Sequence, residues 1–187
     1  IRGLSEQDEK KLLLTIEQYM IESSIKHNTI KNILLVQLMF FAGLRVSETV
    51  NLKYTDISEQ IINNEIIYVM NFTGKGNKRR VVPIKEKHIK DTIHFILKNK
   101  KGEYISSKTN GNKMSEEGVK VFFKKMQEKS NMDNSYSVHQ LRHSFAENFV
   151  VKNGNIKILQ EILGHSDIKT SMIYGQVKES DLLRSAI

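Results

Sequence analysis

The chain has no cysteine, no tryptophan and a single proline among its 187 residues. Without cysteine, disulfide bonds and thiolate metal ligands are excluded, and nothing in the composition requires an oxidising compartment. No apolar run reaches the roughly 18 residues that indicate a membrane span. The first residues do not resemble a signal peptide, and we detect neither repeats nor low-complexity tracts. These absences predict a compact, mostly helical cytoplasmic domain with no membrane partner.

The chain carries more basic than acidic side chains. Lysine and arginine total 29 against 21 aspartate and glutamate residues, which gives a formal net charge of +8. Such an excess favours a polyanionic partner, either nucleic acid or an anionic membrane surface. The length fits one domain and suffices to bury a core.

Apolar residues at helical spacing fill the N-terminal quarter of the sequence. They predict a helix over about 6–23, and a second, buried helix that starts at Asn28 or Thr29 and is ended by Gly43. Ser47 is positioned to cap a short third helix that runs to about Leu52.

The pattern changes to alternation between residues 56 and 84. Alternating apolar residues at 57–61, a turn at Asn63–Asn64 and a β-branched, aromatic run at 65–72 predict a hairpin. A second turn at 73–78 leads into a third strand at 79–84. The fold class that we predict is α+β: a single domain over residues 1–187, mainly helical, with a small three-stranded antiparallel sheet.

Helical spacing returns after the predicted sheet. A helix after Ser115 carries apolar residues on one side, and on the other side four lysines: Lys120, Lys124, Lys125 and Lys129. Two interpretations of these lysines stay open: they form a face exposed to solvent, or they contact a DNA backbone. The last helices are expected near 138–152, 156–163, 167–173 and 178–185.

The stretch from Ser137 to Gly175 concentrates residues that carry chemistry. Ser137 followed three residues later by Gln140 is a capping-box pattern, which predicts a helix that starts at Val138. His139 and Arg142 then share one face of its first turn. Free backbone N–H groups and the helix dipole make this end of a helix suitable for an anion.

An enzyme that cuts a DNA phosphodiester without a metal needs particular groups. It needs a nucleophile, a base for it, donors for the charge on the phosphoryl oxygens, and an acid for the departing 5′-hydroxyl. Arginine suits the phosphate because its planar fork bonds two oxygens at once. A tyrosine nucleophile would leave a phosphotyrosine, so the step is reversible and needs no nucleotide cofactor. The carboxylate clusters of a two-metal nuclease are not evident in the sequence.

Five motifs occur in an order that resembles the tyrosine recombinases, the phage-integrase family. Arg45 within residues 42–48 is similar to the first arginine motif of the family, and Lys75 within residues 73–84 to its lysine-bearing β-hairpin. His139-Gln140-Leu141-Arg142-His143 matches the His-x-x-Arg box, and Leu163-Gly164-His165-Ser166 the histidine motif that follows. Tyr174 lies nine residues after His165, which is the spacing of the family's nucleophile.

The resemblance implies a role for each of these residues. Tyr174 would attack the scissile phosphate and become joined to the 3′ end, while Lys75 donates a proton to the leaving 5′ oxygen. Arg45 and Arg142 would hold the non-bridging oxygens, with a further hydrogen bond from His165. His139 is the candidate to accept the tyrosine proton, and the identity of the general base stays open. No metal and no cofactor take part.

The resemblance also carries expectations about assembly. We expect a catalytic domain alone, without the N-terminal core-binding domain of the family, and double-stranded DNA as its partner in the cytoplasm of a bacterium. A homotetramer would form on DNA through the C-terminal tail with Val177, Leu182 and Leu183, with room for an accessory DNA-bending protein. Two alternatives stay open: a type IB topoisomerase that relaxes supercoils, and a non-catalytic DNA-binding module on the same fold.

Overall fold

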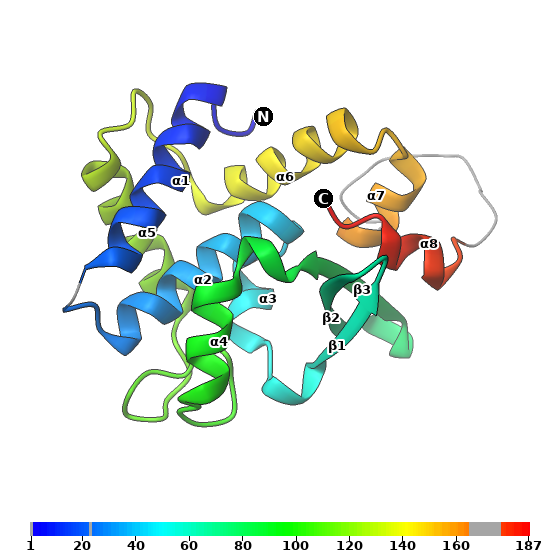
Figure 1. Ribbon diagram of the computed structural model, residues 1–187, viewed down its shortest axis with the longest axis horizontal. Helices are drawn as coiled ribbons and strands as arrows, with labels where there is room; N and C mark the ends of the chain where they lie inside the picture. Colours follow the sequence, from blue (N-terminus) through cyan, green and yellow to red (C-terminus); the bar gives the residue numbers. More distant parts are fainter. Residues whose placement is uncertain (1, 23, 165–176) are drawn as a thin grey trace.

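The computed structural model describes residues 2–22, 24–164 and 177–187, which form eight α-helices and one antiparallel sheet of three strands (Figure 1). The α+β fold class predicted from the sequence is confirmed. The elements are α1 (Glu6–Ile21), α2 (His27–Ala42), α3 (Val46–Asn51), β1 (Ile57–Ile62), β2 (Glu65–Thr73), β3 (Arg79–Lys85), α4 (Lys90–Lys98), α5 (Glu116–Ser130), α6 (Val138–Lys152), α7 (Ile156–Leu163) and α8 (Glu179–Arg184).

The sheet is a meander in the order β1-β2-β3, joined by two tight turns. Asn63 and Asn64 turn the chain between β1 and β2 with φ of 52° and 63°, values that asparagine tolerates better than most residues. Phe72 of β2 pairs with Arg80 of β3, next to the second turn. Both turns and all three strands were predicted from the sequence.

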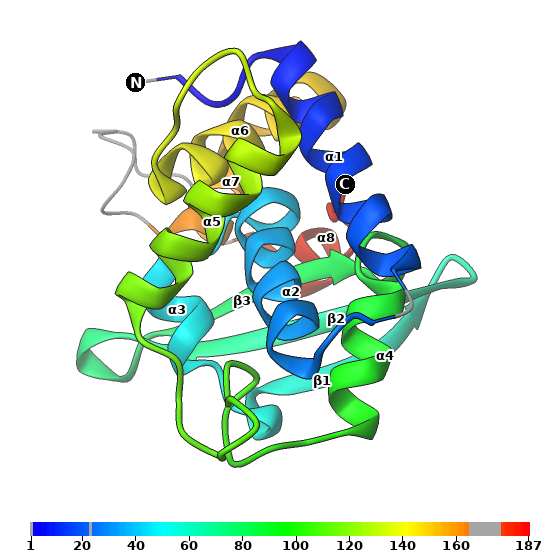
Figure 2. The ribbon, with the colours of Figure 1, turned by 90° about the vertical axis from the view of Figure 1, so that its left-hand side faces the viewer.

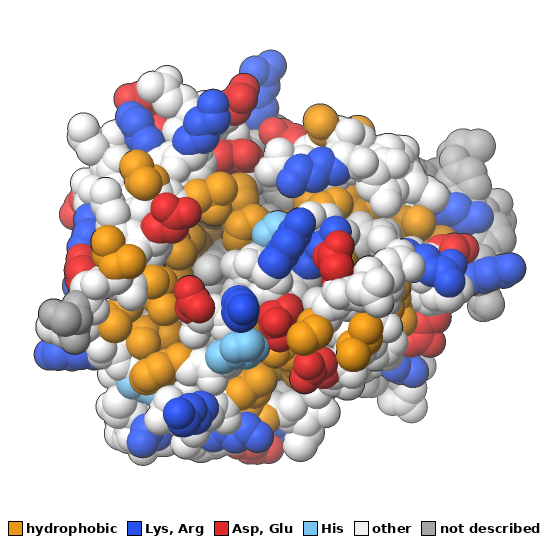
Figure 3. Space-filling model, in the orientation of Figure 1, with side chains coloured by type: hydrophobic (Ala, Val, Ile, Leu, Met, Phe, Trp, Pro, Cys, Tyr) orange, Lys and Arg blue, Asp and Glu red, His pale blue; other side chains and the backbone are white. Residues whose placement is uncertain are grey.

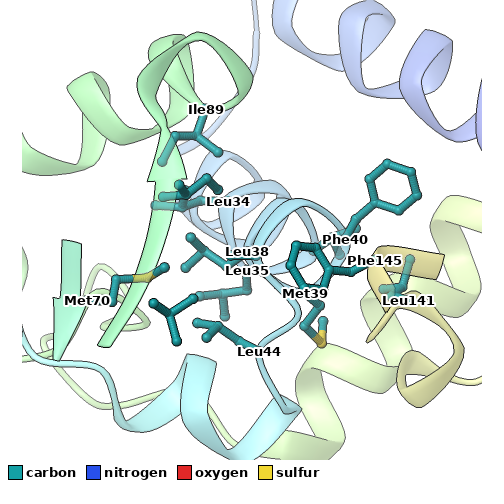
Figure 4. Close-up of a cluster of buried hydrophobic side chains, with 14 of the residues drawn as sticks. Leu34, Leu35, Leu38, Met39, Phe40, Leu44, Met70, Ile89, Leu141 and Phe145 are labelled. Carbon is teal, nitrogen blue, oxygen red and sulfur yellow. The ribbon is translucent and has the colours of Figure 1, made fainter. Parts of the chain in front are cut away.

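Helix α2 forms the centre of the core. Leu34, Leu35 and Leu38 point toward β2, where Met70 lies, while Leu141 and Phe145 of α6 lie on the opposite side of the helix (Figure 4). The helix therefore lies between the sheet and α6, and Figure 2 shows the sheet running beneath it. Because α2 is apolar on almost every side, it is stable only when it is covered on both flanks.

The structure corrects two predicted helix starts. Helix α2 begins at His27, slightly before the predicted Asn28 or Thr29. Ser47 does not cap α3: the N-cap is Arg45, whose backbone N–H donates to Oε1 of Glu48 at 2.8 Å. A glutamate at the third helical position can satisfy the N-cap N–H by itself, which is why the serine is not needed at the cap.

The lysine face of α5 is divided between two environments. Lys129 donates to Glu22 of α1 at 2.7 Å, and its Nζ lies 4.1 Å from the centre of the Tyr19 ring. Lys129 thus contacts α1 although 38% of its side chain is exposed, and Lys120, Lys124 and Lys125 are exposed as well.

The C-terminal helix α8 packs on its own domain. It lies beside β3 and α7, with Leu182 and Leu183 buried (Figure 1). Its bounds agree with the predicted 178–185 to one residue at each end. The predicted helix at 167–173 falls outside the described residues.

The surface carries charges of both signs. On the face shown in Figure 3, lysine and arginine alternate with aspartate and glutamate, so the excess positive charge is not gathered there. In the described ranges we find no helix with both the length and the apolarity needed to cross a membrane.

Candidate active site

The start of α6 places His139 and Arg142 on its first turn, as the sequence predicts. The Gln140 side chain accepts a hydrogen bond from the Ser137 backbone N–H at 2.9 Å, which fixes the entry into the helix at Val138. Gln140 also donates to the backbone carbonyl of Arg2 at 3.1 Å. Residues near the N-terminus therefore help to hold the turn that carries His139.

Arg142 is buried, with 3% of its surface exposed. Its Nη1 donates to the carbonyl oxygen of Gly43 and its Nη2 to that of Leu163, both at 2.7 Å. Gly43 ends α2 and Leu163 ends α7, so the guanidinium satisfies carbonyl groups at two helix C-termini. The side chain is thereby held in one orientation before any ligand arrives.

Arg45 lies opposite, at the N-cap of α3, with a third of its side chain exposed. Arg45, His139 and Arg142 line a single cavity of about 180 Å³. The remaining lining residues are Leu44, Val46, Ser47 and Val138. The structure thus brings together three of the six site residues that the resemblance names, around a space of a size that suits a small anionic group.

Glu48 connects the cationic side chains of the site. Its carboxylate is hydrogen-bonded by both terminal nitrogens of Arg80: Nη1 donates to Oε2, and Nη2 donates to Oε1 at 3.1 Å. The guanidinium groups of Arg45 and Arg142 lie 3.7 and 3.8 Å from the same carboxylate. Three guanidinium groups therefore surround one carboxylate.

The ionisation of these groups reflects their burial and their mutual charge. Burial acts to raise the pKa of the Glu48 carboxyl, but hydrogen bonds and charge from Arg80, the Arg45 N–H and the charge of Arg142 outweigh it, so the pKa is lowered. Burial, followed by the charge of Arg45, lowers the pKa of Arg142 to about 9. Arg142 still carries its charge at neutral pH, at an electrostatic cost that an anion in the cavity would relieve.

His139 is held mostly neutral. Partial burial and the charges of Arg142 and Arg45 lower the pKa of its imidazole below the usual value. The ring meets that of His143 edge to face, with centroids 4.7 Å apart. A neutral imidazole at the cavity wall is able to accept a proton near neutral pH.

The other three predicted site residues are placed less completely. Lys75 begins the short helical turn η2 (Lys75–Asn77) between β2 and β3, where Gly76 and Asn77 adopt positive φ. The lysine is thus on the hairpin turn that the sequence predicts, and only its backbone is described. His165 and Tyr174 lie outside the described residues.

Arg80 is the residue of the site that sequence reasoning missed. The sequence pattern places Arg80 only within the hairpin motif, between Arg79 and the apolar pair Val81–Val82. The register of the sheet turns Arg80 toward Glu48, while Arg79 pairs with Asn71 near the surface. Since every second strand residue faces the same side, Arg80 shares its side with Val82, which is fully buried, and this spacing was a signal of an inward charge that needs a partner.

Within the described ranges, no group of three or more histidine, aspartate or glutamate side chains is arranged to hold a metal ion. The site as described is built from guanidinium, imidazole and carboxylate groups.

Known proteins resemble this chain over most of its length. A family model described as the phage integrase family matches residues 3–181. The tyrosine recombinase XerH of Campylobacter jejuni is 34% identical over 178 residues, which cover 91% of this chain and 47% of that protein. The chain spans about half the length of the curated relatives that it matches.

Solved structures agree with this fold. The XerH site-specific recombinase, in a pre-cleavage complex with its difH substrate, superposes with a TM-score of 0.75 at 26% identity, over 89% of this chain and 47% of that one. The lambda integrase catalytic core superposes with a TM-score of 0.62 at 19% identity, over 88% of this chain and 92% of that core.

Proposed function

Because the chain belongs to the phage integrase family, we propose that it is a site-specific DNA recombinase domain that breaks and rejoins strands through a 3′-phosphotyrosine intermediate. The observation that carries the proposal is the cavity lined by Arg45, His139 and Arg142. Two arginines from different helices and an imidazole with lowered pKa suit a phosphodiester better than a neutral ligand.

In the proposed reaction the hydroxyl of Tyr174 attacks the scissile phosphorus. The bond from phosphorus to the 5′ oxygen breaks as the bond to the tyrosine oxygen forms, so the number of phosphodiester bonds is unchanged. The tyrosine proton passes to His139, and Lys75 supplies a proton to the departing 5′ oxygen. Attack by a 5′-hydroxyl on the phosphotyrosine reverses these steps and joins the strands.

Arg45 and Arg142 would bind the two non-bridging oxygens and stabilise the charge that builds on them, with His165 as a further donor. The two carbonyl bonds of Arg142 support this assignment, since they fix the guanidinium without requiring rearrangement on binding. A preorganised donor is worth more to catalysis than one that must be ordered by the substrate.

We further propose that residues 1–187 act as the catalytic domain of a recombinase that assembles as a homotetramer on double-stranded DNA in the cytoplasm. Lambda integrase has been solved bound to DNA, and as a tetramer bound to a Holliday junction. These structures support the proposal that the partners are DNA and further copies of the same chain. In that assembly the C-terminal tail would dock on a neighbouring protomer, leaving its present position beside β3 and α7. An accessory DNA-bending protein would act outside this domain.

The test is covalent trapping. The protein is mixed with fragmented bacterial genomic DNA, quenched in detergent and digested, and peptides joined to nucleotides are identified by mass spectrometry. We expect an adduct on Tyr174 that Tyr174→Phe abolishes and that the matched variant Tyr104→Phe retains. Sequencing the attached DNA should return a limited set of sites.

Other results would redirect the proposal. Adducts spread over unrelated sequences would indicate topoisomerase-like relaxation. Absence of any adduct, from this chain and from its full-length protein on its attachment DNA, would leave a DNA-binding module without catalysis.

A further inference from the structure

We infer that Arg80 is a positioning residue that occupies the Glu48 carboxylate and so keeps that carboxylate out of hydrogen-bond distance of the guanidinium groups of Arg45 and Arg142. The inference deepens the proposed function, because Arg45 and Arg142 are the groups proposed to bind the scissile phosphate. Arg80 itself does not line the cavity.

The contacts of Arg80 hold its guanidinium in one place. Nε donates to the carbonyl oxygen of Ile162 in the last turn of α7 at 2.5 Å, and both terminal nitrogens donate to Glu48. The guanidinium carbon lies 5.0 Å from the centre of the Phe72 ring, across the strand pair. One side chain thus connects β3 with α3, α7 and β2, and only 15% of it is exposed.

The carboxylate of Glu48 is largely engaged by these bonds. Oε1 accepts from the Arg45 backbone N–H at 2.8 Å and from Arg80, while Oε2 accepts from Arg80. The Arg45 and Arg142 guanidiniums remain at 3.7 and 3.8 Å, which is beyond a hydrogen bond. Attraction across this gap is weaker than a direct, charge-assisted bidentate pair.

Removal of Arg80 would change this balance. Glu48 is buried apart from 14% of its side chain, and a buried carboxylate without a partner is costly. A small rotation would bring its oxygens onto Arg45 or Arg142, which are already less than 4 Å away. Glu48 would then compete with the phosphate for the same guanidinium groups.

The experiment compares four forms of the protein: wild type, Arg80→Met, Glu48→Gln and the double variant. Methionine keeps an apolar stem over Phe72 and removes the charge, and glutamine keeps an acceptor for the Arg45 N–H. Binding of inorganic phosphate is measured by phosphorus NMR at constant ionic strength, with unfolding temperature recorded in parallel. This binding does not depend on strand cleavage.

We expect Arg80→Met to weaken phosphate binding about 10- to 100-fold, since it allows one or two charged hydrogen bonds within the protein to replace those to the ligand. The double variant, which adds Glu48→Gln to Arg80→Met, should bind phosphate at least tenfold more tightly than Arg80→Met alone, because a neutral amide competes poorly with phosphate. Arg80→Lys should fall between wild type and Arg80→Met. The matched control Arg79→Met, in the neighbouring strand position, should bind phosphate as the wild type does.

A merely structural role for Arg80 predicts a different pattern. The unfolding temperature would fall, and the double variant would bind phosphate no better than Arg80→Met, because it loses one more ionic partner. That result overturns the inference, as does a wild type that binds no phosphate.

Strand cleavage separates the inference from the proposed function. On the attachment DNA, single-turnover cleavage should follow the same order of variants. Rescue of phosphate binding without any cleavage in the wild type would retain the role of Arg80 and reject the recombinase proposal.

Discussion

The guanidinium of Arg142 and the carbonyl oxygen of Gly43 are joined by a 2.7 Å hydrogen bond, 99 residues apart in sequence, at the point where α2 ends. The same guanidinium bonds the carbonyl of Leu163 where α7 ends. A side chain proposed to bind phosphate is therefore also a structural tie between two helices.

Arg142→Lys is expected to lower the free energy of unfolding by about 2–4 kcal/mol, because one ammonium cannot reproduce two buried, directional bonds. Urea denaturation checks this value. Arg184→Lys is the matched control, since Arg184 is exposed and should change stability by less than about 0.5 kcal/mol. Equal effects of the two changes would contradict a structural role for the Arg142 bonds.

Gly43→Ala should destabilise the domain for two reasons. Gly43 has a φ of +73°, and a Cβ there would lie 2.4 Å from the Phe145 ring. Left-handed backbone costs about 1 kcal/mol and overpacking a further 1–3 kcal/mol. Gly76→Ala isolates the first cost, because Gly76 has a φ of +70° and nothing within 4 Å of a built Cβ. Denaturant midpoints that coincide for the two variants would show that Phe145 moves aside freely.

Lys31 predicts a pH dependence of stability. It is 1% exposed in α2, its Nζ lies 2.8 Å from Sδ of Met114, and burial, with the charge of Lys108, lowers the pKa of the amine to about 8. Above that value the folded amine is neutral while the unfolded amine, with a pKa near 10.5, still binds a proton. Stability should therefore rise between about pH 8 and pH 10, as the cost of the buried charge disappears.

Lys31→Met should remove this dependence. At pH 7 we expect it to raise the free energy of unfolding by up to about 3 kcal/mol, which is the shift of the amine pKa converted at 1.4 kcal/mol per unit. Urea unfolding at several pH values makes the measurement, and Lys98→Met supplies an exposed control in α4. A wild-type stability that is flat or falling over pH 8–10 would refute the prediction.

The lowered pKa of His139 sets the acid limit of the proposed cleavage. Because partial burial and the charges of Arg142 and Arg45 favour the neutral ring, a base at this position stays active below the usual histidine pKa of about 6.5. Single-turnover cleavage against pH should fall only in more acidic solution. His139→Gln should slow cleavage about 100-fold and abolish that acid limb, whereas His94→Gln, on an exposed part of α4, should leave both unchanged. An acid limb that persists in His139→Gln would assign the base elsewhere.

Deletion of residues 178–187 should separate cleavage from assembly. The deletion removes α8, so Leu182 and Leu183 leave their site beside β3 and α7. We expect single-strand cleavage to remain largely intact and the pairing of two DNA sites to be impaired, as gel-shift and cross-linking experiments would show. Intact pairing would mean that the tail does not join protomers.

Local patterns in the sequence were sufficient for most of the fold. The capping pair Ser137–Gln140 and the turn at Asn63–Asn64 act through neighbours in the chain, so the start of α6 and the first hairpin followed directly from them. The predicted start of α3 was wrong because Ser47 and Glu48 both offer a hydrogen-bond acceptor near the same helix end. Only the geometry shows which of the two is used.

The site was predictable in part. The motifs led to Arg45, His139 and Arg142, and the structure places these three on one cavity. The role of Arg80 was hidden because it depends on strand register and on a partner 32 residues away. Likewise Lys129 could not be separated from the other lysines of α5 until Glu22 and Tyr19 of α1 were placed beside it.

The double attachment of Arg142 has a consequence for quality control in the cell. When α2 and α7 fold to their native C-terminal ends, the carbonyl groups there bind Arg142. The same step therefore orients the guanidinium that is proposed to bind phosphate. We expect substitutions that remove this charge to loosen the fold as well, which would expose the defective chains to proteolysis. Such variants would therefore be degraded sooner than the wild type, which limits how long an inactive chain could occupy the DNA that it is proposed to cleave.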